Sequence, residues 1–129
     1  MIRTALRIVL AVFYAVAGYF HLVRPEPFLT VMPSLVPWPE AVVYWTGIAE
    51  IVGAFALVQP ISLRLRRAAG IALALYALAV WPANINHFAM DMASEDGGLG
   101  LAYHVPRMFA QPVLIVWALW AGEAIAPRR

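Results

Sequence analysis

Residues 40–58 read EAVVYWTGIAEIVGAFALV, and Glu50 is the only charged side chain after the first position of this run. A helix that spans a membrane needs about 20 mostly apolar residues at a rise of 1.5 Å each. The stretch therefore predicts a membrane-spanning helix. Glu50 lies ten positions after Glu40, so it is expected about 15 Å from the start of the helix, near the middle of the bilayer.

The composition of the whole chain agrees with a membrane environment. Of the 129 residues, 64% are hydrophobic and 12% are charged, whereas a soluble domain carries roughly 25% charged residues. So few polar groups cannot cover the surface of a soluble monomer, and such high hydrophobicity also excludes a disordered chain. The chain has no cysteine, which excludes disulfides and thiolate metal sites. Its basic residues are arginines clustered between apolar stretches, so we expect no nucleic-acid partner.

Three further apolar windows of similar length flank this stretch. They are residues 4–23, 68–87 and 106–125. With residues 40–58 they predict an all-α fold, an integral membrane four-helix bundle that forms a single membrane domain over residues 1–129.

The connections between these windows differ in character. Residues 24–39 contain five prolines and cannot form one continuous helix. They are nevertheless apolar, so we expect an outer loop that lies in the membrane interface over the mouth of the bundle. Residues 90–101, with three glycines, are expected to form the flexible loop before the last span.

Arginine positions predict the orientation of the bundle. Two arginines, Arg24 and Arg107, fall on the side opposite the termini. Seven fall on the side that holds both termini: Arg3, Arg7, Arg64, Arg66, Arg67, Arg128 and Arg129. The positive-inside rule then places both termini in the cytoplasm and the protein, as a multi-pass protein, in the inner (plasma) membrane.

The N-terminus also has the features of a cleavable signal peptide. Arg3 and Arg7 precede the apolar run 8–20, which contains the small-residue triplet Ala15-Val16-Ala17. We favour a retained span, because cleavage would leave three spans and move the C-terminal arginines to the wrong side of the membrane.

Polar side chains in the apolar spans are the candidates for function. An ionisable group inside the bilayer is costly and is a functional hypothesis by default. Because successive spans alternate in direction, these groups are predicted to gather in the outer half of the bundle. The candidate ligand-binding residues are Glu50, Arg107, Gln111, Asn84, His21, His87 and Tyr14.

Each of these residues also has a structural interpretation. Glu50 can be a protonated acid that holds helices together through Tyr76 or Gln111, and Arg107 can be a snorkelling interfacial side chain. A metal site made of His21, His87, His104 and Glu50 fits by ligand type. We expect none, because no H-x-x-x-H or E-x-x-H spacing places two ligands on one helical turn.

Several short motifs resemble the DoxX family of small four-span membrane proteins. They are Gly18-x-x-His21 with Pro25 and Phe28, Gly47-x-x-Glu50-x-x-Gly53, Pro60 with its arginine cluster, Pro82-Ala83-Asn84, and Arg107-x-x-x-Gln111-Pro112. The resemblance implies a four-helix fold and, for some relatives, a link to redox work such as thiosulfate oxidation coupled to quinone.

These observations lead to three functional hypotheses. The first is a ligand-binding or redox-partner membrane subunit, whose outer-leaflet cavity holds a quinone-like or lipid-like molecule. In it, Arg107 meets an anionic or carbonyl group, Asn84 and Gln111 orient the ligand, and Glu50 exchanges a proton. The second is a structural or assembly partner without a ligand. The third is a small transporter with Glu50 as a proton relay, for which an oligomer would have to supply the missing inner path.

Overall fold

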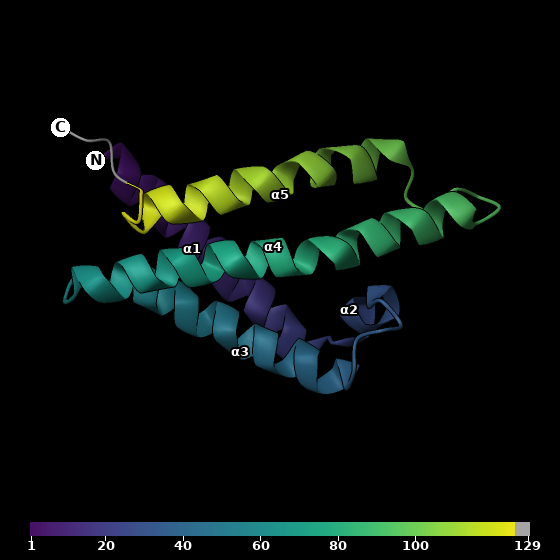
Figure 1. The fold of residues 1–129 in the computed structure, drawn as a ribbon, viewed down its shortest axis with the longest axis horizontal. Helices are drawn as coiled ribbons and strands as arrows, with labels where there is room; N and C mark the ends of the chain where they lie inside the picture. The colour runs from purple at the N-terminus through teal and green to yellow at the C-terminus, as the bar shows by residue number, and fades with distance from the viewer. Residues whose placement is uncertain (126–129) are drawn as a thin grey trace.

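The computed structural model describes residues 1–125 of the chain, and within them it is all-α, as predicted. Four long helices and one short helix follow one another along the chain (Figure 1). They are α1 (Ile2–Val23), α2 (Glu26–Val31), α3 (Pro39–Val58), α4 (Leu63–Ala93) and α5 (Leu101–Ala121). Arg128 and Arg129, which entered the prediction of orientation, lie outside the described residues.

The long helices are arranged as two pairs. α1 packs most extensively against α3, α4 packs against α5, and contacts between α3 and α4 join the pairs. The start of α1 and the end of α5 lie at the same end of the bundle, whereas α2 lies at the opposite end (Figure 1). We call these the termini end and the α2 end.

The packed core lies toward the termini end. Its largest members are Tyr14, Leu10, Leu57 and Leu73, and its other members are alanines, most of them in α3, α4 and α5. Small residues let helix backbones approach closely, which drives helix association in membranes. The alanine-rich core therefore holds the long helices together mainly at the termini end.

Two glycines allow α1 and α3 to touch backbone to backbone. A Cβ atom added at Gly18 would lie 2.5 Å from the carbonyl oxygen of Gly47, and one added at Gly47 would lie 2.6 Å from the Cβ of His21. No larger residue fits at this crossing without moving a helix. Because His21 and Glu50 each follow one of these glycines by three positions, the crossing also brings these two side chains together.

The third apolar window is part of a longer helix than predicted. The sequence indicated a span over residues 68–87 and a loop over 90–101, but α4 continues through Pro82 to Ala93. The turn is confined to the residues after α4, where Gly97, Gly98 and Gly100 all have positive φ angles. Glycine adopts this conformation without strain, so the chain reverses there and the residues before it stay helical.

The last helix is displaced toward the N-terminus relative to the predicted 106–125. α5 begins at Leu101 and contains Pro106 and Pro112 within it. It ends at Ala121 because Gly122 packs against Gly70 and Glu123 takes a positive φ of 61°. A non-glycine residue in that conformation does not continue a right-handed helix.

Three of the helices, α1, α3 and α4, are long and apolar enough to cross a membrane among residues 1–125. α5 does not reach this hydropathy, because His104, Arg107 and Gln111 lie in its first half. Its outward face is still apolar, with Phe109, Val113 and Val116 all more than half exposed. The membrane-compatible surface therefore includes part of α5.

Candidate ligand cavity

A cavity of about 640 Å³ lies between the long helices at the α2 end. α2 and the segment after it cover one side, where Phe28, Val31 and Met32 line the wall. Asn86 of α4 anchors this cover by donating a hydrogen bond to the carbonyl oxygen of Val31 at 2.9 Å. The predicted loop over the bundle mouth thus contains a short helix and closes a real hollow.

Most of the wall is apolar, but every long helix contributes polar side chains to it. These are Tyr14 and His21 from α1, Thr46 and Glu50 from α3, Tyr76 and Asn84 from α4, and Arg107 and Gln111 from α5. All the candidate ligand-binding residues predicted from the sequence lie in this wall except His87. His87 lies beyond Arg107, outside the cavity lining.

Glu50 and His21 form the polar group nearest the α1–α3 crossing. Glu50 is 3% exposed, and its Oε2 lies 3.5 Å from Nδ1 of His21. The Thr46 hydroxyl donates to the carbonyl oxygen of Val42 at 2.7 Å. Its oxygen is then free to accept from His21 Nδ1 at 3.2 Å, which places the ring hydrogen on Nδ1. The ring of Phe28 packs edge-on against His21, 3.9 Å between centroids.

Arg107 forms a second polar group on the α4–α5 side. Its Nη2 donates to Oδ1 of Asn84 at 2.6 Å, and its Nη1 lies 3.3 Å from Nδ1 of His87. The guanidinium also stacks over the ring of Tyr103 at 4.7 Å. The Asn84 side chain is thus engaged by Arg107. Arg107 is held in place rather than extended freely toward solvent.

Three buried polar atoms in the cavity have no hydrogen-bond partner among the described residues. They are Oη of Tyr14, Oε2 of Glu50 and Oε1 of Gln111. More than nine in ten buried polar groups in proteins are satisfied, and each exception costs about 1–3 kcal/mol. Water or a polar ligand in the cavity can pair with these three atoms.

The sequence reasoning left two polar wall residues, Thr46 and Tyr76, out of the candidate set. The spacing of both residues in the sequence could have identified them. Thr46 precedes Glu50 by four positions, and Tyr76 precedes Asn84 by eight, so each shares a helix face with a candidate. Tyr76 lies beside the Glu50 carboxyl, one of the two contacts expected for that acid.

The four residues that fit a metal site by ligand type lie in two separate places. His21 lies with Glu50, while His87 packs against His104 with 4.8 Å between ring centroids. His104 precedes the predicted span 106–125, but α5 begins before it, and the side chain is fully buried. These four residues therefore cannot share one ion.

An ionic cluster closes the termini end. Glu123 Oε1 accepts from Arg7 Nη2 at 2.7 Å and from Arg66 Nη1 at 2.9 Å, and Arg7 Nε also donates to the carbonyl oxygen of Ala121. Burial raises the pKa of the Glu123 carboxyl, but the hydrogen bond from Arg66 and the charges of both arginines outweigh burial and leave the pKa below its ordinary value. This cluster joins α1, α4 and the end of α5.

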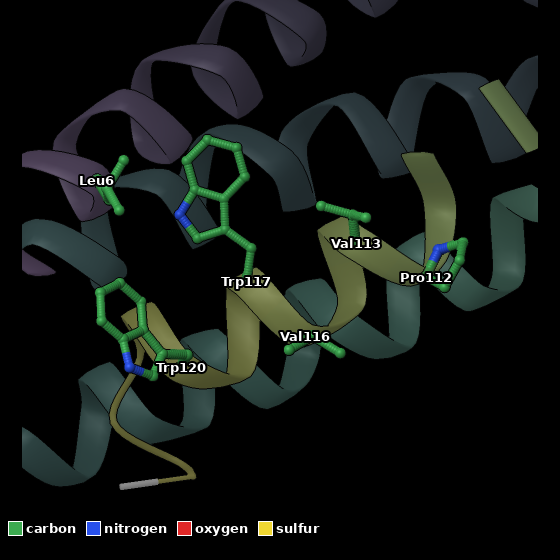
Figure 2. Close-up of a pocket in the computed structure, with 6 residues that line it drawn as sticks. All are labelled: Leu6, Pro112, Val113, Val116, Trp117 and Trp120. Atoms are coloured by element: carbon green, nitrogen blue, oxygen red, sulfur yellow. The ribbon is translucent and has the colours of Figure 1, made fainter. Parts of the chain in front are cut away.

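A second hollow lies on the outside of the bundle between α1 and α5. Figure 2 shows Trp117 and Trp120 extending from α5 near Leu6 of α1, with Val113 and Val116 along the same helix. It is an open groove without an ionisable side chain in its lining. Such a surface can bind an acyl chain, but its lining has no side chain for acid–base chemistry.

Comparison with known proteins corrects the family suggested by the motifs. No curated protein and no solved structure matches the chain. One family model does match, and it is not DoxX. Glycine crossings and buried polar residues recur in membrane helix bundles for packing reasons alone, so short motifs of this kind do not identify a family. The matching model covers residues 10–122, and the chain belongs to the family described as "Domain of unknown function (DUF8561)".

Proposed function

We propose that this protein is a four-span protein of the inner membrane with both termini in the cytoplasm. The lipid-compatible surfaces of α1, α3 and α4 support this placement, as does the apolar outward face of α5. Arg3, Arg64 and Arg67 are at the termini end and favour the cytoplasmic side for it. The cavity then lies in the outer half of the bilayer.

The function that the geometry supports best is the binding of a small amphipathic molecule, quinone-like or lipid-like, in this cavity. One observation carries the proposal: an apolar hollow of about 640 Å³ contains three buried polar atoms without partners. Ligand pockets of about 300–1,000 Å³ are typically apolar with a few placed polar groups. A redox role was implied only by the resemblance to DoxX, and the family match removes that support. We therefore propose binding and no redox reaction.

The unpaired atoms define the chemistry that the ligand needs. The Tyr14 hydroxyl has a hydrogen to donate, which suits a carbonyl or phenolate oxygen, whereas Gln111 Oε1 only accepts and suits a hydroxyl. A quinol hydroxyl both accepts and donates, so a quinol can pair with both atoms, whereas a quinone carbonyl can pair only with the Tyr14 hydroxyl. Arg107 and Asn84 would contact the end of the ligand nearest the α2 end, and Glu50 would exchange a proton with the other end.

The test is binding of a short-chain benzoquinone and of a phospholipid analogue to the purified full chain in nanodiscs. Glu50→Gln and Arg107→Ala are expected to keep the helical fold and to weaken binding of one probe at least tenfold. Arg64→Gln, an exposed arginine at the termini end, is the matched control and should bind like the wild type. If neither cavity variant changes the affinity for any quinone or lipid, the proposal is wrong.

The same variants separate the alternatives. A purely structural role predicts that Glu50→Gln lowers the melting temperature while an associated membrane protein is still retained on pull-down. Transport predicts proton-coupled uptake by proteoliposomes of the wild type and none by Glu50→Gln.

A further inference from the structure

Three ionisable side chains outside the cavity converge where α4 ends and α5 begins. We call His87, Asp91 and His104 the outer triad; one potential ligand atom from each lies within 4.8 Å of the other two. His87 and Asp91 are four positions apart on α4 and so share a helix face, and α5 supplies His104. Asp91 Oδ2 lies 2.7 Å from Nε2 of His104 and 3.5 Å from Nε2 of His87.

The members of the outer triad are held in place by the surrounding structure. Asp91 Oδ2 accepts the backbone N–H of Leu99 at 2.9 Å, which ties the carboxylate to the glycine turn. The ring of Phe88 stacks on His104 with 5.0 Å between centroids and an interplanar angle of 14°. Ligands fixed by their neighbours need little reorganisation when an ion binds.

Burial shows which side of the triad is accessible. His104 is 0% exposed, while the side chains of His87 and Asp91 are 19% and 18% exposed. The second ring nitrogen of His104, Nδ1, is also buried and has no hydrogen-bond partner among residues 1–125. The other two ligands leave an opening through which an ion and a further ligand can enter.

We propose that His87, Asp91 and His104 bind a divalent first-row transition metal such as Zn²⁺. Two imidazoles and one carboxylate are the ligand types that such ions take. Three protein ligands leave a fourth position for water or an exogenous ligand, the arrangement of a reactive rather than a structural site. The site does not depend on the proposed function of the cavity, since none of the three residues lines it.

Arg107 opposes this binding in a specific way. A guanidinium only donates, so its Nη1, 3.3 Å from His87 Nδ1, requires that nitrogen to accept and the ring hydrogen to sit on Nε2. A metal bound at Nε2 displaces this hydrogen, so a neutral ring then carries its hydrogen on Nδ1. Arg107 must turn away from His87, while its bond to Asn84 can remain.

The experiment titrates the full chain in nanodiscs, without a histidine tag, with Zn²⁺ in competition with a chromophoric chelator. One Zn²⁺ per chain is expected. His87→Gln and Asp91→Asn should each weaken binding at least tenfold, and Arg107→Gln should strengthen it by removing both a charge and a competing donor. The matched controls His21→Gln and Asp96→Asn should stay within twofold of the wild type.

Folding is checked separately because Asp91 also holds the turn. His87→Gln changes a partly exposed side chain, and its circular dichroism should match that of the wild type. Visible absorption of bound Co²⁺ provides a second measurement, and His87→Gln should abolish it. Failure of the wild type to bind Zn²⁺, or equal binding by wild type, His87→Gln and Asp91→Asn, would overturn the proposal. Neither result bears on quinone binding in the cavity.

Discussion

The contact between Gly18 and Gly47 makes a quantitative prediction about the α1–α3 pair. In Gly18→Ala, the new Cβ would lie 2.5 Å from the carbonyl oxygen of Gly47 and 2.8 Å from Cγ1 of Ile51. Ordinary contacts begin near 3.4 Å, and the carbonyl belongs to a helix backbone that cannot turn aside. The helices must therefore separate by about 0.9 Å at this crossing.

Two opposing terms set the size of the effect. Overpacking of a tight site costs about 1–3 kcal/mol, whereas replacing a helical glycine by alanine gains about 1 kcal/mol, so the expected net loss is up to about 2 kcal/mol. The separation also lengthens the contact between His21 and Glu50, now 3.5 Å. Quinone or lipid binding should weaken along with stability.

Gly53→Ala is the matched control, because it has the same chemical change on α3. Its Cβ would meet only the side chain of Leu73, at 2.8 Å from Cδ2, and a terminal methyl can rotate away. Reversible unfolding in mixed detergent, followed by circular dichroism, compares the two variants. If Gly18→Ala is as stable as Gly53→Ala, the backbone crossing does not control the packing of α1 on α3.

Three further predictions concern other parts of the fold. The pKa of Glu123 lies below its ordinary value of 4.5. The ionised carboxylate therefore contributes fully to the stability of the fold above pH 4.5, and this contribution is lost as the pH falls through the lowered pKa. Glu123→Gln should therefore cost about 1–3 kcal/mol near neutral pH and progressively less in acid; an equal deficit at every pH would contradict the ionic explanation. Gln59 binds both N–H groups of the α3–α4 turn, those of Ile61 and Ser62, at 2.8 Å. Gln59→Ala should lower the unfolding free energy by about 0.5–1.5 kcal/mol, and a change below the error of chemical denaturation would argue against that role. Phe28→Ala removes part of the cavity cover and should speed ligand dissociation more than it lowers the melting temperature, which stopped-flow fluorescence can measure; an unchanged rate would mean that α2 does not cover the site.

Much of the architecture could be predicted from hydropathy and spacing. The apolar windows predicted the four long helices, because a helix in lipid must satisfy its own backbone. The expectation that polar residues of four helices gather in one half relied only on alternating helix direction. It placed Glu50, Asn84 and Gln111 in one region, and the structure brings them to one cavity wall.

The ends of the helices could not be predicted in the same way. The glycines near residue 97 suggested a loop over residues 90–101, yet the helix continues to Ala93 and only the glycines turn. The position of the helix end depends on tertiary contacts, such as the hydrogen bond that the backbone N–H of Leu99 donates to Asp91 Oδ2. Since Asp91 was expected in a loop, its helical spacing from His87 was not considered, and the outer triad was missed.

Arg107 connects the two polar groups at the α2 end. It lines the cavity, contacts His87 of the outer triad and hydrogen-bonds Asn84 of the cavity wall. If metal binding turns Arg107 away from His87, the guanidinium has to find new acceptors, and the cavity is the polar environment next to it. The affinities of Zn²⁺ and of an anionic cavity ligand would then be linked, and thermodynamic reciprocity requires each to change the other by the same factor. Arg107→Gln should abolish that linkage: Zn²⁺ binding persists, the cavity ligand binds more weakly because Arg107 is lost, and neither ligand then changes the affinity for the other.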